Sequence, residues 1–317
     1  MVQNTAANAS LKGRSGVNVY FRALRWRSWI GWLFFFGLGC TMFAIPTYNV
    51  LPISISFSLV TGAIFVLNQY FDRNSDKTNP QKRDLPVAAG QLTPNQSSIL
   101  FVSLFALGLL LTAVTDYTLL FLFVAYIGVG IAYSAPPIHF KKRPVLDLLA
   151  VGMGAGILPF LIGLQASNQL TLDYSLPWIW RRYLDTFLCI IPLFLFQVAT
   201  HIFQAIGDYD ADKGEKITTF VVKYGKERSA KIAVIFSLLS LVLPITYGAI
   251  LSFTTEFVYW YLLLLLFFAP LIVYLTRLSA NPTSQNMSRL LKVSHRFTPI
   301  LLLVLYLCAL ILRVCLK

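Results

Sequence analysis

The sequence predicts an all-α integral membrane protein, a bundle of about nine transmembrane helices built as two four-helix halves plus one further helix. Hydrophobic residues make up 57% of the 317 residues and charged residues only 12%, whereas soluble domains carry about 25% charged residues. The mean hydropathy is +0.68. Apolar stretches of roughly 20 residues, the length that crosses about 30 Å of hydrocarbon, recur along the chain.

Each apolar stretch is predicted to be a helix, because lipid offers no partners for backbone polar groups and a helix satisfies them internally. No linker divides the chain, so residues 17–317 are predicted to form a single membrane domain. Residues 1–16 are polar and small, and we expect a disordered cytosolic tail there. The predicted spans are 28–46, 51–71, 96–114, 118–136, 146–164, 184–206, 230–250, 257–275 and 297–314.

The basic residues predict the orientation of the bundle. The formal net charge is +13. If the N-terminus is cytosolic, the segments on that side hold 22 of the 26 Lys and Arg residues, as the positive-inside rule requires. Topology therefore explains the basic excess without nucleic acid as a partner. We expect a multi-pass protein, in the cell membrane if bacterial, with the N-terminus and the acidic motifs on the cytosolic side.

The first acidic motif, Asn68, Asp72 and Asp76, ends the second span in the stretch NQYFDRNSDKTNPQKRDLP. Spacings of four residues place the three side chains on one helical face. Ionised groups in a membrane helix cost about 2.5–3.5 kcal/mol each and need a partner. Two carboxylates near a helix C-terminus repel each other and gain nothing from the helix dipole. A divalent cation removes both problems, and oxygen-only ligands favour Mg²⁺, which also binds phosphate oxygens.

The second acidic motif follows the sixth span in HIFQAIGDYDADKGEKITT. Asp208 and Asp212 share a helical face, whereas Asp210 is predicted to point away into solvent. The competing interpretation is that both motifs are solvated loop acids. Their corresponding positions, four spans apart and each followed by a basic loop, argue instead for an internal repeat that places them opposite each other.

Cations accompany the acidic motifs. Metal-bound carboxylates together with Lys and Arg side chains form a site for a diphosphate. The adjoining apolar bundle would hold a hydrocarbon tail, so the predicted substrate is an isoprenyl diphosphate. The cations are Lys82 and Arg83 after the first motif, Lys141 and Lys142 after the fourth span, and Lys213 and Lys216 after the second motif.

The motif pair, together with YSAPPIHFK at 133–141, resembles the UbiA superfamily of intramembrane prenyltransferases over nearly the whole chain. The resemblance implies a central cavity in a nine-helix bundle, with Asn68 assisting the metal site. It implies that Arg83 and Lys141 bind the diphosphate and that Tyr133 lines the pocket. Gln69 departs from the pattern, since many members carry Asp there. The metal ligands implied for two Mg²⁺ ions, which are also the catalytic residues, are Asp72, Asp76, Asp208 and Asp212.

The implied reaction transfers a polyprenyl group from the diphosphate, through an allylic carbocation, to a hydrophobic acceptor such as a quinone precursor, a pigment or a carotenoid. His201 is a further candidate substrate-binding residue, because a lone histidine in a span is unusual. HIFQAIGDYDAD is similar to the carotenoid-elongating branch of the superfamily. An intramembrane terpene cyclase would use the same metal–diphosphate site without an acceptor. A transporter would place its acids at mid-membrane instead.

Three glycines, Gly152, Gly154 and Gly156, form a GxGxG pattern inside the fifth predicted span. A nucleotide-binding loop of this pattern needs a strand before it and a helix after it. Because both flanks are transmembrane here, we expect the glycines to permit close helix packing.

Overall fold

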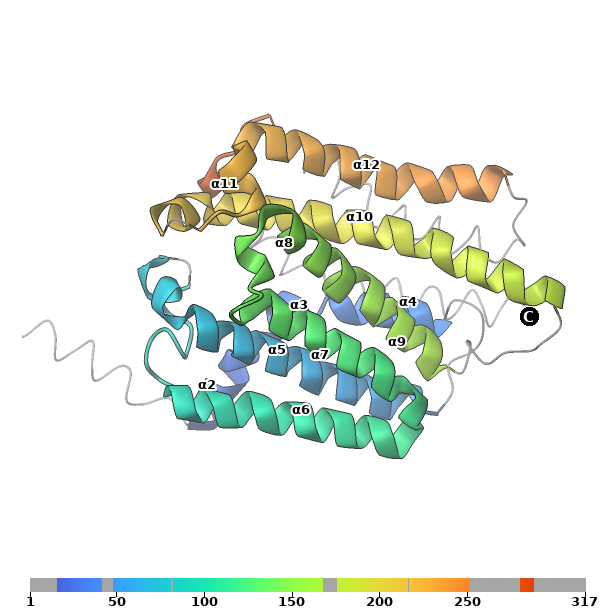
Figure 1. Ribbon diagram of the computed structural model, residues 1–317, viewed down its shortest axis with the longest axis horizontal. Helices are drawn as coiled ribbons and strands as arrows, with labels where there is room; N and C mark the ends of the chain where they lie inside the picture. Colours follow the sequence, from blue (N-terminus) through green and yellow to red (C-terminus); the bar gives the residue numbers. More distant parts are fainter. Residues whose placement is uncertain are drawn as a thin grey trace, which may run out of the picture.

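The computed structural model describes residues 16–41, 48–80, 82–167, 176–215, 217–250 and 280–287, and the elements within these ranges are helical. The long helices run side by side and alternate in direction (Figure 1). In chain order the elements are α2 (Gly16–Ala23), α3 (Trp26–Trp29), α4 (Trp32–Thr41), α5 (Val50–Thr78), α6 (Pro94–Asp116), η1 (Tyr117–Leu119), α7 (Leu120–Ser134), η2 (Phe140–Lys142), α8 (Pro144–Val151), η3 (Gly152–Ile157), α9 (Leu158–Ala166), α10 (Leu176–Gly214), α11 (Phe220–Tyr224) and α12 (Lys226–Ile250).

Within the described ranges, 4 helical segments are long and apolar enough to cross a membrane. They contain the predicted spans 51–71, 96–114 and 146–164 and most of 118–136 and 184–206, and the all-helical membrane class is confirmed. The predicted span 28–46 begins as two short helices, α3 and α4. The predicted spans 257–275 and 297–314 and the predicted tail, apart from its last residue, lie outside the described residues. The four segments are Val50–Thr78, Pro94–Ser134, Pro144–Ala166 and Thr186–Gly214.

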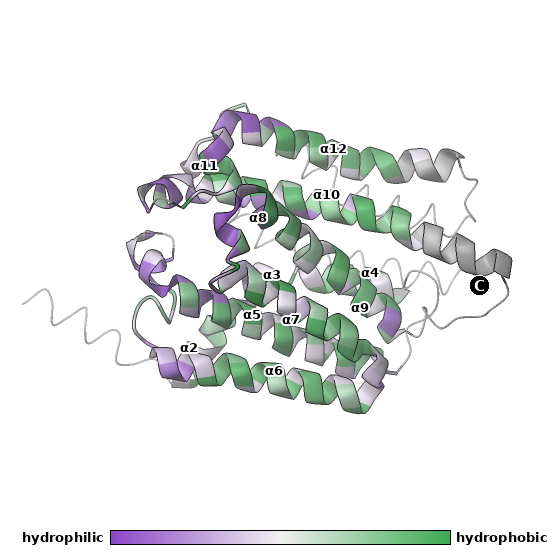
Figure 2. Cartoon of the chain, in the orientation of Figure 1, coloured by the Kyte–Doolittle hydropathy of each residue, from purple (hydrophilic) through white to green (hydrophobic). Residues whose placement is uncertain are grey.

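One end of the bundle is polar. The helices α5, α7 and α10 finish there, and α6, α8 and α12 begin there (Figure 1). Hydrophilic residues concentrate at this end, while the helix bodies are hydrophobic (Figure 2). We call it the polar end, formed by residues 68–80, 82–93, 135–143, 208–215 and 217–226. Both acidic motifs belong to it, as the repeat argument predicts.

Two apolar clusters hold the bundle together. The first, between α4, α5, α7 and α9, includes Phe57, Phe123 and Ile162. The second, between α8, α10, α11 and α12, includes Phe203 and Val221. One face of α5 is therefore buried against its neighbours in the first cluster.

Glycine lets the backbones of α4 and α9 touch. A Cβ added to Gly163 would lie 1.9 Å from the carbonyl oxygen of Phe36, and one added to Gly39 would lie 2.1 Å from that of Phe160. Any side chain at either position would push the helices apart. Small residues at helix crossings are the usual means of close packing in lipid, where no hydrophobic driving force acts between helices.

The GxGxG glycines lie in a single π-helical segment, η3, between α8 and α9. Pro159 has no N–H to donate to Ala155, which accounts for the local change in hydrogen bonding. The Leu158 N–H donates instead to the Met153 carbonyl. A Cβ on Gly152 would lie 2.3 Å from the Phe194 ring on α10. Close packing, the predicted role of these glycines, is confirmed at this position.

Candidate active site at the polar end of the bundle

The first acidic motif lies on the last three turns of α5. Because α5 is helical from Val50 through Thr78, the spacing of Asn68, Asp72 and Asp76 puts all three on one face. Asp72 is 6% exposed and Asp76 is 4% exposed. These carboxylates are therefore buried inside the bundle and do not lie in a solvated loop.

Asp72 is held by two donors from outside its own turn. The Lys141 Nζ lies 2.5 Å from Asp72 Oδ2, and Asn68 Nδ2 donates to the same oxygen at 2.9 Å. Asn68 Nδ2 also lies 3.2 Å from the hydroxyl oxygen of Ser134 at the end of α7. The segment 135–143 turns the chain back between α7 and α8, and this turn brings Lys141 over α5. Asn68 and Lys141 thus both contact Asp72.

The second acidic motif lies near the end of α10. Asp212 is 9% exposed, and the side chain of Asp208 is 23% exposed. Asp210 behaves differently, because its side chain is 70% exposed and lies 3.2 Å from Lys226, and it accepts a hydrogen bond from Ser284 at 2.6 Å. The prediction that Asp210 points away into solvent is confirmed.

Residues that follow α5 connect the two motifs. Lys82 Nζ lies 2.8 Å from Asp208 Oδ2, and Asn79 Nδ2 lies 3.4 Å from Asp208 Oδ1. Thr78 donates a short hydrogen bond to Glu215, just beyond α10. The ends of α5 and α10 therefore meet, although their motifs are far apart in sequence.

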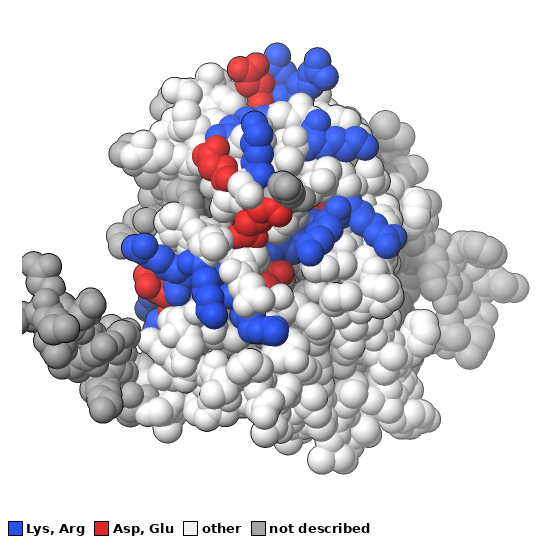
Figure 3. Space-filling model, turned by 60° about the vertical axis from the view of Figure 1, so that its left-hand side comes forward, with Lys and Arg blue, Asp and Glu red and all other residues white. Residues whose placement is uncertain are grey.

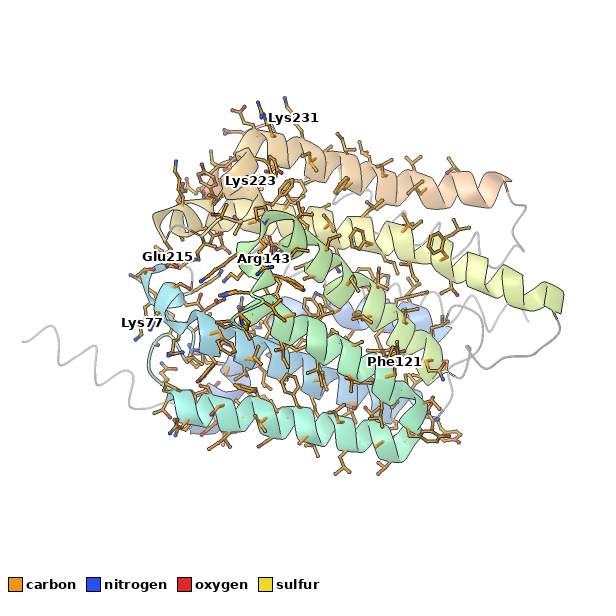
Figure 4. All side chains as sticks on the ribbon, viewed as in Figure 1. Lys77, Phe121, Arg143, Glu215, Lys223 and Lys231 are labelled. Atoms are coloured by element: carbon orange, nitrogen blue, oxygen red, sulfur yellow. The ribbon has the colours of Figure 1, made fainter. Side chains whose placement is uncertain are left out.

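Figure 3 shows acidic and basic side chains gathered on the polar end, with other residues covering the rest of that view. In Figure 4, Lys77, Arg143, Glu215 and Lys223 lie at this end in four different segments of the chain, whereas Phe121 lies at the opposite end. Charged side chains from several segments of the described chain thus gather at one end of an apolar bundle.

Lys141 faces carboxylates of both motifs. Its side chain is only 14% exposed, and burial alone would lower the pKa of its ammonium group. The negative charges of Asp72, Asp76 and Asp212 outweigh burial and raise the pKa of Lys141 above the ordinary lysine value. Lys141 therefore stays protonated and ready to bind an anion at any physiological pH.

Sequence reasoning missed Arg25, which was counted only as a topological cation. Arg25 adopts a left-handed backbone conformation with φ 50° between α2 and α3. Its guanidinium lies 5.4 Å from the centre of the Phe65 ring. Burial lowers the pKa of Arg25, and the carboxylates of both acidic motifs act against that shift. A third cation thus faces the site from the N-terminal helices.

Asp76 and Asp212 lack the cationic contacts that Asp72 and Asp208 have. Among the described residues, no hydrogen bond or ion pair engages either of the two carboxylates. A buried carboxylate without a partner is costly. In the same part of the chain, no three His, Cys, Asp or Glu side chains form a closed metal site. Asp76 and Asp212 supply carboxylate oxygens, and Mg²⁺ takes one or two such ligands and completes its shell with water and phosphate oxygens.

The remaining predicted site residues are Arg83, Tyr133 and His201. Arg83 is exposed, and the structure brings its neighbour Lys82 to Asp208 instead; its role in binding a diphosphate stays a prediction. Tyr133 packs edge-on against His201, with ring centres 6.4 Å apart. His201 Nε2 lies 2.9 Å from Asp147 Oδ1. Asp147 was also missed, although an acidic residue at the start of an apolar span is a signal for function.

The chain matches the UbiA prenyltransferase family over residues 18–297. It is 30% identical over 223 residues to a lycopene elongase/hydratase of Corynebacterium glutamicum, covering 68% of this chain and 67% of the relative. It is 30% identical to a digeranylgeranylglyceryl phosphate synthase of Thermococcus sibiricus over 58% of this chain and 60% of the relative. A probable homogentisate phytyltransferase 2 of Oryza sativa is 30% identical over 52% of this chain and 42% of the relative.

Solved structures share the fold. A UbiA homologue from Archaeoglobus fulgidus, solved with GPP and Mg²⁺ bound, superposes with a TM-score of 0.74 at 19% identity, covering 92% of this chain and 99% of that one. The apo UbiA homologue from Aeropyrum pernix gives a TM-score of 0.66 at 15% identity, covering 94% and 99%. The family match over most of the chain and the two acidic motifs agree: this protein is a member of the UbiA prenyltransferase family.

Proposed function

We propose that this prenyltransferase binds Mg²⁺ and an isoprenyl diphosphate at the polar end and transfers the isoprenyl group to a carotenoid-type polyene. The observation that carries the diphosphate site is the pair of buried carboxylates, Asp76 and Asp212, which form no ion pair with a cation among the described residues. They stand beside Asp72 and Asp208, which cations already hold. A Mg²⁺ ion bound to the diphosphate would supply the positive charge that Asp76 and Asp212 lack.

Asp72, Asp76, Asp208 and Asp212 would hold Mg²⁺, which when bound neutralises the charge that develops on the departing diphosphate. Lys141 and Lys82 donate to the oxygens of the same diphosphate, since both ammonium groups already point at the acidic motifs. Asn68 keeps the Asp72 carboxylate in place through its 2.9 Å hydrogen bond. Preorganised donors of this kind stabilise charge in the transition state because they need no reorganisation.

The body of the bundle receives the hydrocarbon. Below the polar end, the helix bodies are apolar (Figure 2), so the allylic carbocation would form where water is scarce. Exclusion of water protects such a cation from capture as an alcohol. An acceptor that reaches the cation from this side must itself be lipophilic.

The acceptor class rests on the relatives. Three relatives from different organisms, Corynebacterium glutamicum, Haloarcula japonica and Haloferax volcanii, are lycopene elongase/hydratases. The first of them aligns with 68% of this chain. These names favour a polyene hydrocarbon over a quinone precursor or another pigment as the acceptor of this chain.

In the membrane, we place about nine helices in one domain spanning residues 17–317, with the N-terminus and the polar end in the cytosol. The continuous family match over residues 18–297 supports a single domain. The distribution of Lys and Arg supports the orientation. The cytosol also supplies the water-soluble diphosphate head and the Mg²⁺.

The test uses the full chain in lipid nanodiscs with Mg²⁺ and dimethylallyl or geranyl diphosphate. Lycopene and homogentisate are supplied as acceptors in separate reactions, and the products are identified by mass spectrometry. We expect lycopene enlarged by one prenyl unit. Prenylated homogentisate alone would contradict the proposed acceptor class. A cyclic hydrocarbon formed without any acceptor would identify a terpene cyclase instead.

A further inference from the structure

A second buried polar cluster lies next to the diphosphate site, and the mechanism above does not use it. His201 on α10 and Asp147 on α8 form a pair, with 2.9 Å between Nε2 and Oδ1. The side chain of Asp147 is 1% exposed and that of His201 is 13% exposed. The other carboxylate oxygen of Asp147, Oδ2, is buried and has no hydrogen-bond partner in the described part of the chain. An ionisable pair buried so deeply in an apolar bundle is costly, and such residues usually mark a functional site.

The position of the pair relates it to the reacting carbon. His201 precedes Asp208 by seven residues and Asp212 by eleven, so all three share one face of α10. Seven residues at 1.5 Å each place His201 roughly 10 Å from Asp208 along the helix, on the hydrocarbon side. Tyr133 from α7 covers the imidazole edge-on. His201 is therefore located below the diphosphate head, where the prenyl chain and the acceptor would meet.

The contact with Asp147 sets the state of the imidazole. An ionised carboxylate only accepts hydrogen bonds, so Nε2 carries the proton in this contact, and in the neutral imidazole Nδ1 keeps its lone pair. Among the described residues, Nε2 is the ring nitrogen that has a hydrogen-bond partner. Because Asp147 is the more buried member, His201 is the member that can reach a substrate. A histidine with a free ring nitrogen, oriented by a carboxylate, has the arrangement of a general base.

We propose that His201 accepts the proton that the acceptor loses during prenyl transfer, with Asp147 as the positioning residue that orients and stabilises the imidazole. This inference rests on the proposed function. The C1–O bond of the prenyl diphosphate breaks and both electrons leave with the diphosphate. A double bond of the polyene attacks C1, which forms a C–C bond and leaves a cation on the acceptor. A neighbouring C–H bond then breaks, its electrons form a new double bond, and the proton moves to Nδ1 of His201.

The proposal separates two steps that one assay can measure in parallel. Release of diphosphate from geranyl diphosphate without acceptor reports ionisation, and prenylated lycopene reports transfer. We expect His201→Gln to reduce transfer by about 10²-fold or more, the contribution of a general base. Diphosphate release should stay within about threefold of wild type, because the variant leaves the metal and cation site intact. The ratio of geraniol to prenylated lycopene should rise accordingly.

Asp147→Asn tests the positioning role. The amide keeps the volume but cannot stabilise a protonated imidazole, so transfer should fall by about tenfold or more. Lycopene deuterated at its terminal methyl groups supplies a readout that a purely structural role would not change. We expect a larger isotope effect on transfer in both variants than in wild type, because proton removal becomes the slow step.

Tyr126→Phe is the matched control, since it removes a buried interhelical hydrogen bond, 2.9 Å between Thr61 and Tyr126, on the α5 and α7 side. It should change neither readout. Equal loss of diphosphate release and transfer in the His201→Gln variant would overturn the proposal in favour of a structural role. Full transfer activity in that variant would overturn it as well. If wild type releases diphosphate but does not prenylate lycopene, the proposed acceptor is wrong and the proton assignment is rejected with it.

Discussion

The two acidic motifs are predicted to act as one site, and a double-mutant cycle tests this directly. The perturbations are Asp72→Ala, Asp208→Ala and their combination. Each substitution removes a proposed metal ligand and leaves a lysine without its partner, Lys141 at 2.5 Å in one case and Lys82 at 2.8 Å in the other. Both changes weaken the stabilisation of the negative charge that forms on the departing diphosphate.

The expected magnitude follows from the two roles of each carboxylate. One preorganised electrostatic contact contributes about 10²–10³ in rate, and a metal ion contributes several kcal/mol more. We therefore expect each single variant to lose about 10³-fold in kcat/KM, or about 4 kcal/mol. Independent sites would multiply these losses to about 10⁶-fold. Residues that act as a unit should instead leave the double variant within about tenfold of the worse single variant.

The assay is release of diphosphate from geranyl diphosphate over a range of Mg²⁺ concentrations. Asp210→Ala is the matched control on the same helix, because its side chain is 70% exposed and its pair with Lys226 lies at the surface. Exposed pairs contribute about 0–1 kcal/mol, so this variant should keep nearly full activity. A double variant that shows the full product of the single losses would refute the single-site reasoning. Damage from Asp210→Ala equal to that from Asp208→Ala would refute the assignment of helix faces.

Three further outcomes can be measured. Excess chelator should abolish turnover and added Mg²⁺ should restore it; full turnover in chelator would exclude the metal site. Single cysteines introduced within 77–92 or 213–228 should react with an impermeant reagent from the cytosolic side, and labelling from the opposite side would reverse the topology. Gly152→Ala should lower stability by about 1–3 kcal/mol through overpacking, because its Cβ would lie 2.3 Å from the Phe194 ring. Gly128→Ala, with open space around the added atom, should not destabilise the fold, which a thermal shift in detergent can check.

The acidic motifs were predictable from sequence because their geometry is local. A spacing of four residues shares a face in any α-helix, and α5 remains helical through both Asp72 and Asp76. By the same spacing rule, Asp210 does not share the helical face of Asp208 and Asp212. Its side chain is 70% exposed, which confirms that prediction. Hydropathy likewise depends only on composition along a window, so most of the described apolar helices were predictable, although α10 extends eight residues beyond each predicted end and the predicted span 28–46 begins as two helices.

Contacts that depend on loop conformation were not predictable in this way. Lys82 and Arg83 are adjacent, and nothing in their order says which one reaches Asp208. The choice depends on the chain direction after α5, which the structure settles for Lys82. Lys141 reaches Asp72 because residues 135–143 fold back over α5. Arg25 lies over the Phe65 ring of α5, at a left-handed residue between α2 and α3, where the sequence offers no glycine as a signal.

The contact between His201 and Asp147 was not predictable from the sequence either. Each residue is unusual by itself, a histidine within one apolar span and an aspartate at the start of another. Their contact exists because α8 and α10 cross closely, and this crossing depends on Gly152, where any side chain would meet the Phe194 ring. A glycine pattern that resembles a nucleotide loop thus has a different consequence in this fold. By letting α8 and α10 approach each other, the glycine pattern brings Asp147 Oδ1 within 2.9 Å of His201 Nε2, the ring nitrogen that Asp147 orients.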